Sequence, residues 1–256
     1  DTGEAAIGGV GTMVKQLTNC RNKGNVTYTA GNGLYVGGVA ARADDQVLTG
    51  CVNTGNVTST GNYAGGIVGQ KSGAMWGTPT ASSDCQNSGN ISGKRFVGGI
   101  FGSTGGTTTN CHNTGSVHAN QYIVGGVIGD FNGKNQTISG CTNSGAVDAA
   151  MESAGGIAGS MQGTYLANCY NTGKVHSDGV FGDTGAAGGI AGAMTCKSSN
   201  LYNTGAVSSA ATTCNVGGIV GEMSNTSKTV LEQNWYNIGT VTGTNPGDKA
   251  RIGALA

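Results

Sequence analysis

Short runs in which small or apolar residues alternate with polar ones recur along this chain about every 30 residues. One clear copy is Cys51-Val52-Asn53-Thr54-Gly55-Asn56-Val57, and the run Gly65-Gly66-Ile67-Val68-Gly69 follows it. Alternation with a period of two over so few residues predicts short β-strands. Apolar residues do not recur at helical spacing over the length of a helix anywhere in the chain. We therefore expect an all-β fold with almost no helix.

The run C-x-N-x-G-x-V has eight copies, which follow one another at intervals of 26 to 34 residues. They begin at Cys20, Cys51, Cys85, Cys111, Cys141, Cys169, Leu201 and Trp235. A period of this length indicates a solenoid, a propeller or an array. Two strong strand runs per repeat are too few for a propeller blade, and insertions between the runs suit the corners of a solenoid. We predict one domain over residues 1–256, a parallel β-solenoid (β-helix) of about eight coils with roughly 30 residues per coil.

Equivalent residues of successive coils in such a solenoid lie ~4.8 Å apart, so each repeat position becomes a column. Alternation directs the Cys, Asn and Val of the run inward. The asparagines should then form a buried ladder in which each amide donates to the next. Its members are Asn22, Asn53, Asn87, Asn113, Asn143, Asn171, Asn203 and Asn237. We expect the glycine after each Asn to take a positive φ at a corner, and the Gly-Gly pair to let the backbone approach the opposite wall.

Charge and composition narrow the class of protein. Thirteen basic and thirteen acidic residues leave no net charge, which argues against nucleic acid or an anionic membrane as a partner. The chain has no apolar stretch long enough for a membrane span and does not begin with a signal peptide. A polar, weakly charged surface suits a secreted or cell-surface protein. Because free solenoid ends need caps, we expect a segment of a longer array or a processed chain.

Six of the eight cysteines occupy one repeat column. Stacked side chains point in parallel, which is poor disulfide geometry, so we predict a column of buried thiols packing as small apolar groups. Its members are Cys20, Cys51, Cys85, Cys111, Cys141 and Cys169, and Leu201 and Trp235 continue it. Cys196 and Cys214 lie off the column. Their spacing allows either one disulfide across the seventh repeat or two unbonded residues.

The repeated C-x-N-x-G-x-V, combined with runs such as Gly217-Gly218-Ile219-Val220-Gly221, resembles the GLUG motif. The resemblance extends from Gly8 to about Val241. That motif is found in bacterial surface proteins, including the non-catalytic region of IgA-specific metallopeptidases and large adhesin-like proteins of gut bacteria. It implies a spacer or adhesin role. We expect no cofactor. The zinc signature H-E-x-x-H of those peptidases is missing, so the resemblance does not imply catalysis.

Two columns of aromatic residues are candidate ligand-binding surfaces. Tyr170, Tyr202 and Tyr236 follow the cysteine column at an outward position, and Tyr35, Tyr63 and Phe96 precede the Gly-Gly column. Such strips suit stacking on sugar rings or docking of a host protein. The alternative is cross-strand stacking that only shields the sheet.

A third column places His118, Asp148 and His176 in a vertical row. Histidine and aspartate are ordinary zinc ligands, so the row is a candidate metal site. The alternative is an exposed polar ladder whose carboxylate pairs with the imidazoles, because a straight row lacks converging tetrahedral geometry.

Two further features keep other functions open. The hydroxyl column Thr54, Ser88, Thr114, Ser144, Thr172 and Thr204 resembles an ice-binding face, although turn chemistry explains it equally well. Asp178 and Asp183 form the nearest acidic cluster for a carbohydrate-active enzyme, and the alternatives are a solvated loop or a weak Ca²⁺ site. Our leading hypothesis is a non-enzymatic surface module that binds host protein or glycan. End-to-end stacking into a fibre or surface layer is another alternative.

Overall fold

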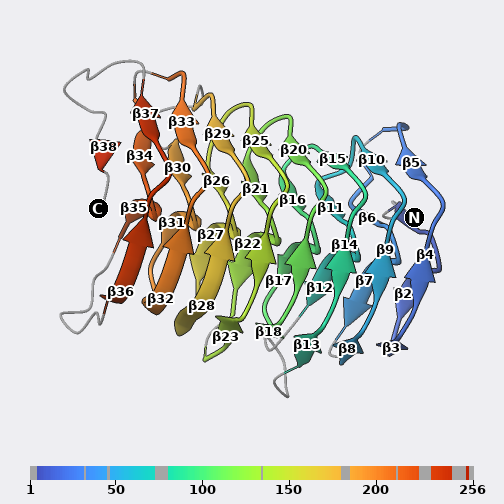
Figure 1. The fold of residues 1–256 in the computed structure, drawn as a ribbon. Helices are drawn as coiled ribbons and strands as arrows, with labels where there is room; N and C mark the ends of the chain where they lie inside the picture. The colour runs from blue at the N-terminus through green and yellow to red at the C-terminus, as the bar shows by residue number, and fades with distance from the viewer. Residues whose placement is uncertain are drawn as a thin grey trace.

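The structure is a computed structural model, which describes residues 5–31, 33–44, 47–72, 80–133, 135–179, 185–211, 213–224, 232–243 and 252–253. Every regular element in these residues is a β-strand, and every strand pairing is parallel. The coils stand side by side in one row from the N-terminal to the C-terminal end (Figure 1). The predicted all-β parallel solenoid is therefore confirmed.

Four sheets run the length of the solenoid, and their strands follow in stacking order. Sheet A contains β1 (Ala6–Gly8), β6 (Tyr35–Gly37), β11 (Tyr63–Gly65), β16 (Phe96–Gly98), β21 (Ile123–Gly125), β26 (Ala154–Gly155), β30 (Ala186–Gly188), β34 (Asn215–Gly217) and β38 (Ile252–Gly253). Sheet B contains β2 (Gly11–Val14), β7 (Ala40–Asp44), β12 (Val68–Ser72), β17 (Phe101–Thr104), β22 (Ile128–Asn132), β27 (Ala158–Gln162), β31 (Ala191–Met194) and β35 (Val220–Met223).

Sheet C has two rows of short strands that merge into single long strands toward the C-terminus. The first row is β3 (Leu17–Thr18), β8 (Leu48–Thr49), β13 (Ala81–Ser83), β18 (Thr107–Thr109) and β23 (Thr137–Ser139). The second row is β4 (Arg21–Asn22), β9 (Val52–Asn53), β14 (Gln86–Asn87), β19 (His112–Asn113) and β24 (Thr142–Asn143). The long strands are β28 (Tyr165–Asn171), β32 (Lys197–Asn203) and β36 (Glu232–Asn237). Sheet D contains β5 (Val26–Tyr28), β10 (Val57–Ser59), β15 (Ile91–Gly93), β20 (Val117–Ala119), β25 (Val147–Ala149), β29 (Val175–Ser177), β33 (Val207–Ser209) and β37 (Val241–Gly243).

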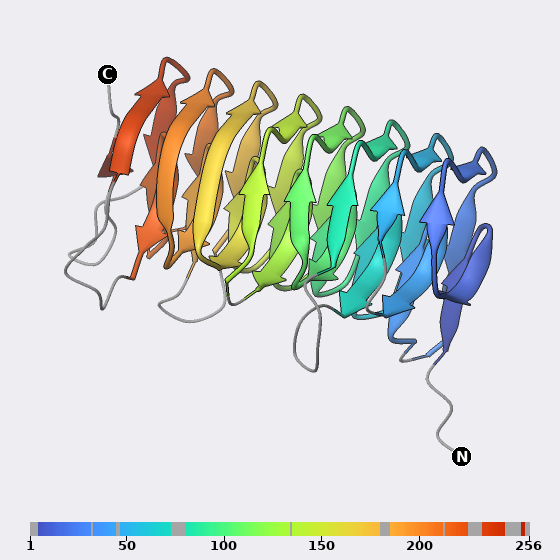
Figure 2. The same cartoon turned by 90° about the horizontal axis from the view of Figure 1, so that it is seen from below.

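Each coil visits the sheets in the order A, B, C and D before the chain moves to the next coil. The eight strands of sheet D are therefore separated by about seven full turns, in keeping with the predicted number of coils. Sheets C and D lie on the near side in Figure 1, and Figure 2 shows the stacked coils from below. No helix in the described residues is long and apolar enough to cross a membrane.

The core consists of two apolar clusters that run along the solenoid. One joins sheets B and C and includes Leu48, Cys51 and Ile67, all fully buried. The other joins sheets A and D and includes Val36 and Val57. In both clusters the inward positions carry Val, Ile, Leu, Cys and Ala, as the period-two pattern predicts.

The predicted asparagine ladder lies between the two clusters. The Nδ2 group of each Asn from Asn22 to Asn203 donates to Oδ1 of the Asn in the next coil at 2.8 Å. Nδ2 of each ladder Asn also donates to the carbonyl of the glycine two residues later, at 2.7 to 2.9 Å. The side chains are buried, so these bonds replace the water that an amide otherwise needs. The structure confirms the ladder.

The second glycine of each Gly-Gly pair faces this ladder. A Cβ atom on Gly38 would lie 2.6 Å from Cγ of Asn53, and Gly66 meets Asn87 in the same way. Only glycine leaves room for the amide there. The predicted close approach of the Gly-Gly backbone is confirmed, and its reason is the ladder itself.

The prediction for the glycine that follows each Asn is wrong. None of the described glycines in that column has a positive φ; a Cβ on Gly55 or Gly145 would instead overlap the carbonyl of the glycine in the previous coil. The left-handed corner lies at the residue before each cysteine-column position. These residues are Asn19, Gly50, Asp84, Asn110, Gly140, Asn168, Asn200 and Asn234, with φ between 51° and 66°. Asn, Asp and Gly are the residues that tolerate this conformation.

Replacing a central ladder residue tests the amide ladder. Asn143→Ala should lower the free energy of unfolding by about 3 kcal/mol or more, because Asn113, Asn171 and Gly145 each lose a buried partner. Urea unfolding followed by circular dichroism measures the change. Ser144→Ala, at the adjacent exposed position, is the control and should change stability by less than about 0.5 kcal/mol. Equal effects of the two variants would contradict the ladder.

A pair of glycine variants separates the two glycine roles. Gly145→Ala should destabilise the fold strongly, because its methyl group meets backbone that cannot move aside. Gly140→Asn should be tolerated, since φ is +66° there and asparagine occupies the equivalent corner in other coils. Thermal unfolding of both variants measures the difference. The assignment fails if Gly140→Asn is the more damaging change.

Candidate ligand-binding surfaces

The first aromatic strip comprises Tyr170, Tyr202 and Tyr236 on strands β28, β32 and β36 of sheet C. The register places the three residues directly above one another. Ring centroids are 4.9 and 5.2 Å apart, and the planes differ by 18° and 3°. Tyr170 and Tyr236 are 36% and 50% exposed, among the most exposed large apolar side chains described. The strip is therefore a continuous aromatic surface that solvent and a ligand can reach.

The second strip comprises Tyr35, Tyr63 and Phe96 on strands β6, β11 and β16 of sheet A. The centroids are 5.4 and 5.1 Å apart, and all three side chains are half-buried. The guanidinium of Arg42 lies 5.5 Å from the Tyr35 centroid, and that of Arg95 lies 5.7 Å from the Phe96 centroid. This strip therefore carries a positive charge at each end. No cation–π contact is found at the first strip among the described residues.

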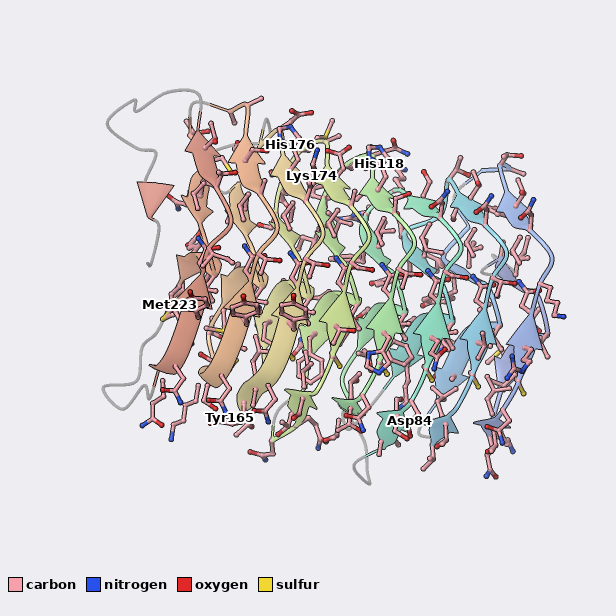
Figure 3. All side chains as sticks on the ribbon, viewed as in Figure 1. Asp84, His118, Tyr165, Lys174, His176 and Met223 are labelled. Atoms are coloured by element: carbon pink, nitrogen blue, oxygen red, sulfur yellow. The ribbon has the colours of Figure 1, made fainter. Side chains whose placement is uncertain are left out.

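The candidate metal row is in register but does not converge. His118 Nδ1 lies 2.7 Å from Asp148 Oδ2, whereas His176 Nε2 lies 3.0 Å from Asp178 Oδ1. Both histidines lie along the sheet D side of the molecule in Figure 3. No group of three His, Cys, Asp or Glu side chains in the described residues could hold a metal ion. The row resembles the polar ladder of the alternative interpretation, but its central carboxylate pairs with one imidazole instead of two: Asp148 pairs with His118, whereas His176 pairs with Asp178 and lies 2.9 Å from Ser208 Oγ.

The cysteine column is present, and its thiols are unbonded. Hydrogen bonding from Cys111 together with burial raises the pKa of the Cys85 thiol to about 12, although Cys51 opposes part of this effect. Burial also raises the pKa of Cys20, the half-buried first member. These thiols therefore act as packing groups.

The disulfide alternative for Cys196 and Cys214 is not what the structure has. Both are buried, unbonded thiols, and they belong to different apolar clusters. Burial raises the pKa of Cys196 to about 12 and also raises that of Cys214. Two unbonded small residues is the correct alternative.

The hydroxyl column lies on the outside of sheet C, largely exposed to solvent. Thr54 Oγ1 and Thr114 Oγ1 lie 3.4 Å from the carbonyl oxygens of Asn22 and Asn87, in the preceding coils. Backbone hydrogen bonding thus occupies part of this column. Of the acidic pair considered for catalysis, Asp178 is bound to His176, and Asp183 lies outside the described residues.

Two features of the surface were missed by the sequence interpretation. The corner column forms a second, exposed amide ladder, in which Asn200 donates to Asn168 at 2.8 Å and Asn234 donates to Asn200 at 2.9 Å. Its restriction to Asn, Asp and Gly was the available signal. The other feature is the contact of the Arg95 guanidinium with the rings of Phe96 and Tyr122. Arg95 lies outside every repeated run, so no column pointed to this contact.

No family model, curated protein or solved structure matches this chain.

Thiol chemistry tests the cysteine assignments. In denaturant without reductant, all eight cysteines should react with Ellman's reagent, because none is bonded. In the native protein at pH 8, Cys20 should be alkylated first, since the raised pKa and burial of the inner thiols leave little reactive thiolate. Mass spectrometry of iodoacetamide-treated protein identifies the labelled sites. Six reactive thiols in denaturant would contradict the assignment of Cys196 and Cys214.

Proposed function

We propose that this chain is a non-enzymatic, extracellular module of a bacterial surface protein that binds a host protein or glycan through its stacked tyrosines. The observation that supports the proposal most is the row of Tyr170, Tyr202 and Tyr236, held in register on three successive strands. Aromatic side chains bury much area at a small cost in conformational entropy, which suits them to recognition.

The solenoid frame supports this role because it holds the strip rigid. Strands β28, β32 and β36 pair with one another along most of their length, and the buried ladder passes through Asn171, Asn203 and Asn237 directly beside the tyrosines. A preorganised surface loses little freedom when it binds a partner. The absence of net charge favours contact through rings and hydroxyl groups over electrostatic attraction.

The cellular location and the lack of catalysis belong to the same proposal. The resemblance of the repeat to the GLUG motif supports a place on the bacterial cell surface. For the absence of catalysis, the support is that Asp178 pairs with His176 and that the row of His118 and Asp148 forms a polar ladder without convergence on a reaction centre. A scaffold with a recognition strip accounts for these features with fewer assumptions than an enzyme does.

Truncation of the middle ring tests the proposed function. Tyr202→Ala removes both stacking contacts of the strip and should weaken ligand binding by about tenfold or more, the effect expected of a central aromatic residue. The screen uses glycan arrays and host extracellular-matrix proteins with the wild-type protein, and surface plasmon resonance then measures the variant. Tyr202→Phe should retain most binding if the ring is what the ligand contacts.

Gln86→Ala is the matched control, because Gln86 occupies the same outward column outside the strip. It should bind like the wild type, and both alanine variants should keep the circular dichroism spectrum of the solenoid. If no ligand shows Tyr202-dependent binding, the strip only shields the sheet.

A further inference from the structure

The second aromatic strip continues beyond Phe96 through a guanidinium. Arg95 Cζ lies 4.5 Å from the ring centroid of Tyr122, in the next coil, and 5.7 Å from that of Phe96. The series Tyr35, Tyr63, Phe96, Arg95 and Tyr122 therefore forms one surface on sheet A and its preceding corner. A guanidinium beside aromatic rings keeps its charge but is partly shielded from water.

The two guanidiniums of this surface differ in how their charge is balanced. Nε of Arg42 lies 2.8 Å from Oδ1 of Asp44, so a carboxylate already pairs with it. Nε of Arg95 is buried and has no hydrogen-bond partner, and Arg95 forms no ion pair within the described ranges. Because Nε is buried, a ligand on the surface would accept hydrogen bonds from the terminal Nη groups, with which no described carboxylate pairs.

Glu152 is an acidic residue that interacts electrostatically with Arg95. Burial raises the pKa of the Glu152 carboxyl, and the charge of Arg95 lowers it by a smaller amount. The two side chains form no ion pair, so Glu152 moderates the local positive charge without satisfying the guanidinium. An anionic ligand at Arg95 would be repelled by an ionised Glu152, which makes Glu152 an internal test of the site.

We propose that this surface binds an acidic glycan, with sugar rings against Tyr35, Tyr63 and Phe96 and a carboxylate or sulfate group on Arg95. This inference rests on the proposed function, because it assumes a glycan-binding module, and it adds the second strip as a binding surface that the proposed function does not use. The planar guanidinium can donate two parallel hydrogen bonds to such an anion. The rings stack on one another and carry a guanidinium over each outer face, so their edges supply the apolar surface for the C–H groups of the sugars.

The spacing of the strip argues against an acidic peptide that extends along the solenoid axis. Side chains on one face of an extended peptide recur about every 6.7 Å, because alternate residues point to opposite faces. The ring centroids of the strip recur at 5.4 and 5.1 Å. The side chains on one face of such a peptide could therefore not contact successive rings of the strip. A nucleic acid would need several clustered cations, whereas Arg95 supplies one.

A glycan array that carries sialylated, uronic-acid and sulfated glycans beside their neutral parents tests the proposal with the full chain. The wild type should bind at least one acidic glycan about tenfold more tightly than its neutral parent, and Arg95→Gln should abolish that preference. Arg21→Gln is the matched control, since Arg21 is an exposed guanidinium on strand β4 of sheet C, away from this surface, and it should keep the preference. Glu152→Gln should strengthen acidic binding several-fold. Carboxylated and sulfated glycans on the same array distinguish the two sources of the anion.

Several results would overturn the inference. They are no binding of acidic glycans, equal binding of acidic and neutral glycans, an unchanged preference in Arg95→Gln, and equally tight binding of a polyglutamate peptide. Thermal unfolding shows whether each variant remains folded; if Arg95→Gln is unfolded, Arg95→Lys, which keeps the charge but loses the fork, replaces it and should lose most of the preference. Binding that depends on Tyr202 without any acidic preference would leave the proposed function standing and remove only this inference.

Discussion

The buried asparagine ladder is the interaction on which the rest of this structure depends. An amide in an apolar interior is unfavourable unless its donors and acceptor are all used. Here one N–H of each internal ladder Asn bonds to the next coil, the other bonds to the glycine two residues later, and Oδ1 accepts from the previous coil. This requirement can be met only if successive coils are in register. A slip of one residue would leave every amide unpaired and would turn the valines outward.

The ladder also explains why so much of the chain is glycine. The amides occupy the space between the two apolar clusters, and the opposite wall must approach them with bare backbone, as at Gly38 and Gly66. The glycines after each Asn stack so closely that a methyl group on Gly55 would overlap Gly24. The repeated shape of the coil thus requires glycine mainly because backbone segments approach one another closely, and less because glycine can adopt unusual φ values. That freedom is used at Gly50 and Gly140, where the corner requires it.

Much of this could be predicted from the sequence because the inward residue types repeat. Alternation alone predicts that Asn53 and its equivalents point into the solenoid. Parallel register then predicts that equivalent residues, including the tyrosines, stack from coil to coil. The position of the left-handed corner could not be predicted in this way, because glycine recurs at several places in each coil and its presence does not distinguish close packing from a positive φ. The pairing of His176 with Asp178 depends on a side-chain rotamer, which a column argument cannot supply. Arg95 and Tyr122 belong to a corner that varies from coil to coil, so no repeat pointed to their contact.

Because the buried amides find all their hydrogen-bond partners inside the solenoid, the outward-facing columns can differ from coil to coil. The column after the cysteines changes from Arg21 and Val52 at one end to the stacked tyrosines at the other without altering the ladder beside it. The same holds on sheet A, where the aromatic column that begins at Tyr35 gives way to Ala186 and Asn215. Each face therefore carries its aromatic surface on only a few coils, and on different coils. Because the inner bonds rather than the surface residues maintain the register, the surface can specialise locally, and a ligand that spans a few coils would meet chemistry that the neighbouring coils do not repeat.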